Sequence, residues 1–218
     1  VAYVSMAHTD SLGLVLAVVQ PDLSLRSDGN SLFLWRRQHH WKSMGRLIRG
    51  GREPVHIPTL LVEPEGAMLV WKAWVPDGGG QRSEGRLMLD PLGPGPHTVH
   101  VIDPDLVPFS NIRSARIAGR QVFITMADEN GDSTGHIRFV GVEGNGVREL
   151  GRVPNPYQAG FHAASTSPAG LLLNGPLLEF GDSTVVTLLL RIGARCAGQG
   201  PRGRDSAVRA NLHRQVNP

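Results

Sequence analysis

The sequence predicts an all-β protein built from four repeats of about fifty residues each. A turn that ends in glycine recurs four times, and these glycines are spaced 53, 53 and 51 residues apart: Gly13, Gly66, Gly119 and Gly170. A strongly apolar segment of strand length follows each of them. Glycine and proline, 27 and 16 of the 218 residues, interrupt every window in which a helix would fit. We therefore expect short strands joined by tight turns.

Each repeat continues with the same order of strands. The second strand of each repeat, directly after the glycine, is expected at Leu14–Val19, Met68–Val75, Val122–Met126 and Leu171–Leu173. The third is expected at Leu32–Trp35, Arg86–Leu89, His136–Val140 and Thr184–Ile192. A fourth strand follows in the first three repeats, at Trp41–Ile48, His97–Ile102 and Val147–Val153. The fourth repeat has no such segment directly after Ile192 and is predicted to lack its outer strand.

The strands differ in their hydrophobic patterns. The second strands are nearly all apolar, as expected for strands buried on both faces between stacked sheets. The fourth strands alternate more, as in Val99–Val101, which suits an outer edge with one wet face. Four antiparallel strands with this gradient are typical of the blades of a β-propeller. We predict blades over residues 1–194, with repeats at about 1–54, 55–107, 108–158 and 159–194.

Two ring sizes agree with these repeats. The chain could form a compact four-bladed ring, or it could be part of a larger propeller. The larger propeller is favoured, because unclosed blades expose unpaired strand edges.

The positive charge of the chain is concentrated at one end. Residues 195–218 form a Gly/Arg-rich tail with a net charge of +4, whereas the whole chain carries +3, so residues 1–194 come to −1. The folded body is therefore not expected to bind nucleic acid, and the tail could bind an acidic partner. No apolar run reaches the roughly 18 residues of a membrane helix. Cys196 is the one cysteine, which excludes an intrachain disulfide and leaves the compartment open, with a secreted or periplasmic protein favoured.

The stretch Pro58–Trp71 resembles the inner strand, turn and second strand of a blade in the sialidase-like propellers with BNR-type repeats. The resemblance covers residues 4–192 by pattern and implies the propeller fold of that family. The Asp-box of the family, a Ser-x-Asp-x-Gly-x-Thr-Trp turn, is not intact. Residues 143–147 stand at its place without the Ser, Asp and Trp, and Ser27–Gly29 resembles the box in a different loop.

Sialidase chemistry would need a nucleophilic tyrosine with a glutamate partner, an acid/base aspartate and three arginines that hold the substrate carboxylate. The candidates are Tyr157, in a loop between repeats, with Arg113 and Arg116 on a predicted innermost strand. These residues could equally be ordinary loop and channel-wall residues.

Four further residues are candidates for ligand binding. His8, His56 and His162 fall at the starts or ends of predicted inner strands, where they could line one mouth of a channel. Trp71 and Trp74 lie three positions apart and face opposite sides of one strand, so one is expected in the core and Trp74 could stack on a ligand. Each of these residues could also be purely structural.

A metal site is expected, if anywhere, in the loop after the second strand of the third repeat. Asp128, Asn130 and Asp132 offer oxygen ligands at alternate positions, as in loops that bind Ca²⁺. A polar hairpin loop without a metal has the same composition. No other cofactor motif occurs in the sequence.

These observations favour a non-enzymatic interaction module that binds a protein or a glycan through its loops. Two alternatives stay open. One is a sialidase-like glycoside hydrolase with an incomplete catalytic set in this chain. The other is a structural subunit of a larger complex, anchored by the basic tail.

Overall fold

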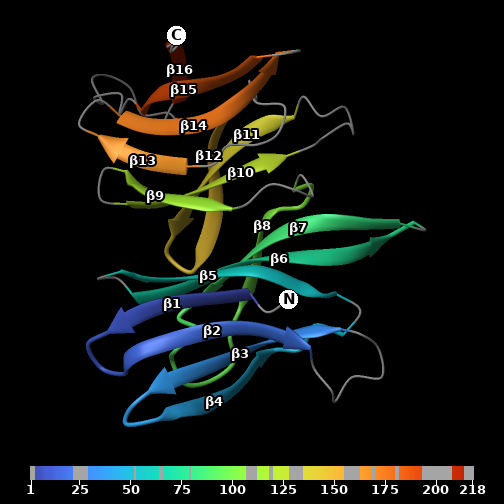
Figure 1. The fold of residues 1–218 in the computed structure, drawn as a ribbon, viewed down its shortest axis with the longest axis vertical. Helices are drawn as coiled ribbons and strands as arrows, with labels where there is room; N and C mark the ends of the chain where they lie inside the picture. Colours follow the sequence, from blue (N-terminus) through green and yellow to red (C-terminus); the bar gives the residue numbers. More distant parts are fainter. Residues whose placement is uncertain are drawn as a thin grey trace, which may run out of the picture. The chain divides into compact units, whose positions relative to one another are not determined.

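The computed structural model contains strands and turns, and no helix, in the part of the chain that it describes (Figure 1). The described residues are 3–21, 29–51, 53–63, 66–78, 80–106, 112–117, 120–127, 135–154, 163–167, 170–179, 182–192 and 208–213. Side chains are described only for residues before 154. Within these ranges no helix is long and apolar enough to cross a membrane.

The strands form four antiparallel sheets of four strands each. Sheet A contains β1 (Tyr3–Thr9), β2 (Gly13–Pro21), β3 (Asn30–Arg37) and β4 (Trp41–Ile48). Sheet B contains β5 (Val55–Glu63), β6 (Gly66–Asp77), β7 (Gly80–Leu89) and β8 (Val99–Asp103). Sheet C contains β9 (Arg113–Ile117), β10 (Arg120–Ala127), β11 (His136–Glu143) and β12 (Gly146–Pro154). Sheet D contains β13 (Ala163–Ser167), β14 (Gly170–Glu179), β15 (Asp182–Ile192) and β16 (Val208–His213).

Each sheet is a simple meander in chain order, which is the topology of a propeller blade. The predicted fold class, all-β with four-stranded antiparallel blades, is confirmed. The predicted second strands lie within β2, β6, β10 and β14, one in each sheet.

The prediction that the fourth repeat lacks an outer strand is wrong. The fourth repeat does have an outer strand, because β16 pairs with β15 and places Leu212 opposite Leu188. This strand lies inside the segment that composition marks as a basic tail. Its sequence Val-Arg-Ala-Asn-Leu-His alternates apolar and polar residues, the period of a strand with one wet face, but arginine and glycine around it obscure that short pattern.

The chain divides into two compact units, Val1–Asp105 and Leu106–Pro218. Unit 1 contains sheets A and B, and unit 2 contains sheets C and D. Within unit 2, β13 and β14 of sheet D contact β9 of sheet C. The first three sheets fall within the predicted repeats 1–54, 55–107 and 108–158, whereas β16 lies beyond the fourth.

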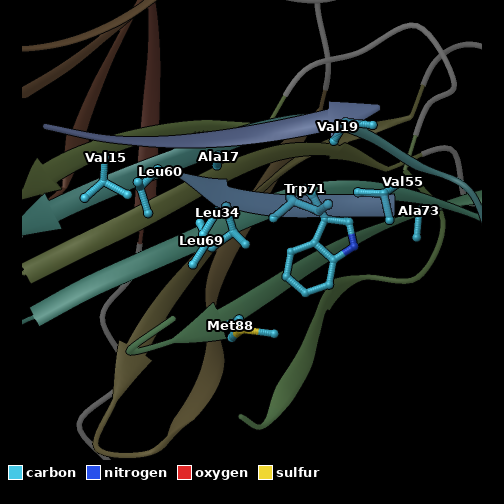
Figure 2. Close-up of a cluster of buried hydrophobic side chains, with 11 residues drawn as sticks. Val15, Ala17, Val19, Leu34, Val55, Leu60, Leu69, Trp71, Ala73 and Met88 are labelled. Atoms are coloured by element: carbon cyan, nitrogen blue, oxygen red, sulfur yellow. The ribbon is translucent and has the colours of Figure 1, made fainter. Parts of the chain in front are cut away.

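The core of unit 1 lies between sheets A and B, which pack face to face (Figure 2). Sheet A contributes Val15, Ala17, Val19, Leu32 and Leu34. Sheet B contributes Val55, Leu60, Leu69, Trp71, Ala73 and Met88. The indole of Trp71, 1% exposed, is the largest side chain in this layer. Burying an apolar side chain of this kind contributes roughly 2–3 kcal/mol, so this layer is the main source of stability in unit 1.

The innermost strands of the two sheets, β1 and β5, are joined by a side chain. The hydroxyl oxygen of Ser5 accepts a hydrogen bond from the backbone N–H of Leu60 at 2.8 Å. Nearby, β5 bulges between His56 and Thr59. Pro58 has no N–H to donate to the ladder, and Ile57 takes a positive φ of 47°, which is costly for a β-branched residue. The bulge therefore interrupts regular pairing between His56 and Thr59.

Two adjacent glycines connect sheet A to sheet B. The N–H of Gly50 donates to the hydroxyl oxygen of Ser31 at 3.1 Å, and a methyl group at position 50 would overlap the carbonyl oxygen of Asn30. Gly51 has open space around it but a φ of 55°, in the left-handed region. The two glycines are thus required for different reasons, a close backbone approach and a backbone conformation.

Alanine substitutions at positions 50 and 51 should distinguish the close backbone approach at Gly50 from the left-handed conformation of Gly51. We expect Gly50→Ala to lower the free energy of unfolding by about 3 kcal/mol or more, because backbone must move to admit the methyl group. Gly51→Ala should cost only about 1–2 kcal/mol, the strain of a left-handed alanine. Urea denaturation followed by circular dichroism measures both. Equal losses would contradict the close contact at Gly50.

Candidate functional site

Unit 1 has two candidate binding regions, one at each end of its innermost strands. The first lies where β1 and β5 begin, near Tyr3 and His56. The second lies where they end, near Thr9 and Glu63. At about 3.3 Å per residue the two regions are roughly 20 Å apart.

At the first end, three rings pack edge to face. The rings of Tyr3 and His56 are 5.9 Å apart at 73°, and those of His56 and Trp74 are 6.1 Å apart at 82°. Both arrangements are favourable for aromatic pairs. The backbone N–H of Trp74 also donates to the carbonyl oxygen of Pro54 at 3.1 Å, which fixes the end of β6 against the chain entering β5.

Lys72 lies directly opposite His56 in the pairing of β6 with β5. It is only 4% exposed, and burial lowers the pKa of its ammonium group to about 8. Burial also lowers the pKa of His56, and the nearby charge of Lys72 lowers it further. His56 is therefore neutral at neutral pH, and Lys72 loses its charge only slightly above it.

At the second end, an open cleft of about 320 Å³ lies at the turns of sheets A and B. Its lining comes from the β1–β2 turn, the β5–β6 turn and the segment after β7: Thr9, Ser11, Leu12, Val62, Glu63, Gly66, Ala67, Asp90, Leu92 and Gly93. Two of the recurring glycine corners, at Gly13 and Gly66, thus belong to the turns that build this cleft. Its volume is at the lower end of the range for small-ligand sites, about 300–1,000 Å³.

Asp90 is held in place at the rim of this cleft. Its N–H donates to the carbonyl oxygen of Ala67 at 2.8 Å, and its carbonyl oxygen accepts from the N–H of Gly93 at 3.1 Å. Its φ of 48° lies in the left-handed region, which aspartate tolerates better than most residues. The carboxylate lies against Gly93, where a β-carbon would overlap it. Glycine at position 93 therefore leaves room for the acid.

The hydroxyl-bearing wall of the cleft is fixed in a similar way. Thr9 is buried, and its Oγ1 accepts a hydrogen bond from the N–H of Leu12 at 2.9 Å. Leu12 and Leu92 are half-buried and pack against the core of unit 1. The cleft thus combines two carboxylates and two hydroxyl groups with an apolar floor.

A separate group of charged side chains joins β7 to the segment that precedes β5. Arg86 on β7 donates to Glu53 at 2.7 Å and, through two nitrogens, to Glu84 at 3.0 and 3.1 Å. Arg82 donates to the other oxygen of Glu84 at 2.9 Å. Burial alone would lower the pKa of Arg86, but its hydrogen bonds to Glu53 and Glu84 raise it. We interpret this group as structural, because its charges are paired with one another.

The structure brings some of the predicted site residues together and separates others. His56 and Trp74 are in contact. His8 is exposed near the end of β1, so it lies at the opposite end of unit 1 from His56 and the two do not share one mouth. Trp71 is buried in the core and Trp74 is half-buried. The role of Trp74 in ligand binding stays a prediction. His162 lies outside the described residues.

The catalytic and metal candidates are described only in part. Arg113 and Arg116 lie on β9, the first strand of sheet C, with Arg116 exposed and Arg113 half-buried. Tyr157 lies outside the described residues, as do the three candidate calcium ligands Asp128, Asn130 and Asp132. Among the residues that are described, no three His, Cys, Asp or Glu side chains gather as a metal site would require.

Sequence reasoning missed Glu63, Asp90 and Lys72. Glu63 directly precedes a glycine corner, and Asp90 begins an Asp-Pro-x-Gly turn at the end of a strand. Both acids were therefore detectable as polar residues at strand ends. Lys72 is the single charged residue within the apolar run Met68–Val75, which marks it as a buried charge.

No protein-family model and no curated protein sequence matches this chain. Among solved structures the chain is similar to Zg3597, a family 117 glycoside hydrolase produced by the marine bacterium Zobellia galactanivorans. The TM-score is 0.48 with 12% sequence identity, over 99% of this chain and 70% of that chain. We draw nothing about activity from a similarity of this size. The finer resemblance to sialidase-like BNR repeats has no support among the family models and stays a prediction.

Replacing Lys72 should make the stability of the protein less dependent on pH. The folded-state pKa of about 8 lies below the ordinary value of 10.5, so between these pH values the unfolded chain binds more protons. The free energy of unfolding of the unmodified protein should therefore rise as the pH increases from 8 to 10.5. Lys72→Met should be more stable at pH 7, by up to about 3 kcal/mol, and this advantage should shrink toward pH 10.

Urea denaturation at pH 7, 8.5 and 10 tests this expectation. Lys42→Met, on the exposed strand β4, is the matched control and should change stability little at any pH. Parallel pH profiles for Lys72→Met and the unmodified protein would show that Lys72 does not titrate as a buried group.

Proposed function

We propose that this chain is a non-enzymatic carbohydrate-binding module whose propeller blades hold a neutral, hydroxyl-rich glycan in the cleft of unit 1. The observation that carries the proposal is the lining of that cleft. Glu63 and Asp90 supply acceptor oxygens, and Thr9 and Ser11 supply hydroxyl groups. Sugar hydroxyls can donate to the acids, while the C–H face of the ring lies on apolar side chains.

The arrangement of charge supports a neutral ligand. The two charged residues that line the cleft are both acidic. A carboxylated or sulfated sugar would meet like charge there, which costs free energy in a partly desolvated site. A neutral sugar meets no such repulsion and can use the carboxylates as strong, charge-assisted acceptors.

The aromatic residues of unit 1 favour the cleft as the glycan site, because none of the described rings Tyr3, Trp74 and Trp41 offers a free surface on which a sugar could stack. Tyr3 and Trp74 direct their interactions to His56, so these rings pack on one another. Trp41 on β4 is 38% exposed, but the guanidinium group of Arg37 lies over its ring at 5.7 Å. A sugar at either place would have to displace an existing contact.

A glycoside hydrolase is the second candidate function. It is favoured by the presence of Glu63 and Asp90 in one cleft, because glycosidases use two carboxyl groups that flank the scissile bond. The same two residues would then act on the sugar instead of only binding it, and release of product distinguishes the two functions.

Isothermal titration calorimetry with neutral gluco-, galacto- and manno-oligosaccharides tests the binding proposal. We expect Asp90→Asn to weaken binding about tenfold, because an amide oxygen is a weaker acceptor than a carboxylate and tenfold corresponds to about 1.4 kcal/mol. Asparagine tolerates the left-handed conformation of Asp90, so the fold should be kept. Asp77→Asn, at the exposed end of β6, makes the same change of charge away from the cleft and should bind normally.

Two results would overturn this proposal. If no oligosaccharide binds, or if the Asp90 and Asp77 variants bind equally well, the cleft is not a glycan site. If reducing ends appear over time and Asp90→Asn abolishes them, the chain is a hydrolase and the second candidate replaces the first.

A further inference from the structure

The hairpin formed by β3 and β4 concentrates the positive charge of unit 1. Unit 1 contains 10 Lys and Arg residues and 11 Asp and Glu residues. Five of these cations and none of the acids lie in residues 30–49, which we call the basic hairpin. The basic hairpin therefore carries +5 and the remainder of the unit −6. The nearly neutral total for residues 1–194 conceals this local separation of charge.

Two cations of the basic hairpin lie directly opposite each other. Arg36 on β3 pairs with Lys42 on β4, and the β-carbons of residues paired in this way are about 5 Å apart. Like charges in such a pair repel each other and lower stability. No Asp or Glu in the described part of the chain forms an ion pair with either residue. An anion from outside the chain would therefore be stabilised between them.

This pair lies on the same side of sheet A as the cleft. Residues that pair across an antiparallel sheet point to the same side, and so do alternate residues of one strand. The register joins Ala7 to Val15, Val15 to Arg36, and Arg36 to Lys42. Thr9, which lines the cleft, is two positions along β1 from Ala7. Arg36 and Lys42 thus point to the side of the sheet that carries the cleft.

The tip of the basic hairpin lies at the end of sheet A where the cleft opens. Arg37, the last residue of β3, pairs with Leu14 at the start of β2. A β-carbon at Gly13 would lie 3.6 Å from the carbonyl oxygen of Arg37, and Leu12, directly before Gly13, lines the cleft. Neighbouring strands are about 5 Å apart, so β3 and β4 lie roughly 5 and 10 Å beyond β2. An oligosaccharide of a few units therefore reaches from the cleft to the hairpin.

We propose that Arg36 and Lys42 form an anion subsite beside the cleft, so that the ligand of unit 1 is an oligosaccharide with a neutral unit in the cleft and a sulfate or carboxylate group on the neighbouring unit. This inference rests on the proposed function, because the cleft must hold the neutral part. The guanidinium group of Arg36 donates two parallel hydrogen bonds to such a group, and the ammonium group of Lys42 adds another. The bound anion also relieves the repulsion between the two cations.

A glycan with few charges fits this arrangement better than a nucleic acid does. Every unit of a nucleic acid strand carries a phosphate. A strand that ran from the cleft to the hairpin would place phosphates against Glu63 and Asp90. An oligosaccharide can carry its charge on one unit and leave the next one neutral, so it meets the acids of the cleft with hydroxyl groups only.

An acidic peptide that added a strand to sheet A is also a poorer occupant. The peptide would pair with the outer edge of β4, the last strand of the sheet (Figure 1). The register of β4 shifts twice against β3, and Gly45 within it has a φ of 119°. Irregularities of this kind bend an edge strand and interrupt regular backbone pairing. Side-chain recognition of an anion needs no such pairing.

Isothermal titration calorimetry with gluco-, galacto- and manno-oligosaccharides in neutral and singly charged forms tests the subsite. The charged forms carry one sulfate or one carboxylate on a terminal unit, made at either end of the chain. At low ionic strength we expect a charged form to bind about tenfold more tightly than its neutral parent, and comparison of the two anions shows which one is preferred. Higher ionic strength should reduce this preference, because Lys42 is exposed.

Lys42→Gln should reduce the preference for the charged form at least about threefold and leave the affinity for the neutral form unchanged. Arg49→Gln is the matched control, because Arg49 is exposed and lies just beyond the far end of β4, roughly 20 Å from Lys42. The control should keep the full preference. Arg36→Gln gives a second reading in case Lys42→Gln fails to fold, and circular dichroism checks each variant.

The possible results separate this subsite from the cleft. If neutral forms bind but charged forms bind no more tightly, or if Lys42→Gln and Arg49→Gln behave alike, the subsite is refuted and the cleft stays a glycan site. If only charged forms bind and Lys42→Gln abolishes their binding, the subsite is supported and the proposed function of the cleft is overturned. Binding of no form overturns both. A single-stranded oligonucleotide that bound as tightly as the charged glycans would replace the glycan by a nucleic acid.

Discussion

The packing of sheet A on sheet B through Trp71 is the interaction on which the rest of unit 1 depends. A large indole ring fills the layer between the sheets, and the small residues Ala17 and Ala73 in the same layer leave it room. Sheets can stack in this way only if alternate side chains of their second strands point into the layer between them. Val15, Ala17 and Val19 of β2 do so, as do Leu69, Trp71 and Ala73 of β6. The hydrogen bond from the N–H of Leu60 to the hydroxyl oxygen of Ser5 links the innermost strands of the same two sheets.

Two cations of unit 1, Arg86 and Lys72, show that burial is compensated to different extents. Arg86 lies between Glu53 and Glu84, so its charge is matched and its hydrogen bonds are made. For Lys72 the effect of burial outweighs that of its neighbours, so the pKa of its ammonium group is lowered to about 8. A buried lysine that is only partly compensated lowers stability, and residues of this kind are found more often near functional groups than in plain cores. Its neighbour across the strands, His56, is one of the histidines that sequence alone singles out.

The candidate binding regions lie at the ends of the strands because side chains fill the middle of the layer. The sequence predicted part of each region. It identified His56 and Trp74, which meet at one end, and it identified the glycine corners, which build the cleft at the other. It did not connect Glu63 with Asp90. It offered His8 and His56 as residues that could line one channel mouth, whereas His8 lies near the end of β1 and His56 near the start of β5. In each case the residue type was visible, while the neighbour depended on how two sheets stack.

What the sequence by itself determined was the local pattern: four glycine corners about fifty residues apart, apolar second strands, and no room for helices. These features follow from the backbone preferences of glycine and proline and from the two-residue period of strands, which act between neighbours in the chain. Only the tertiary structure decided that Thr9, Glu63 and Asp90 line one cleft, that β16 completes sheet D, and that Arg36 and Lys42 point to the same side of sheet A as Thr9. Each of these depends on contacts between residues far apart in sequence, which the stacking and register of the sheets set and which no local pattern encodes.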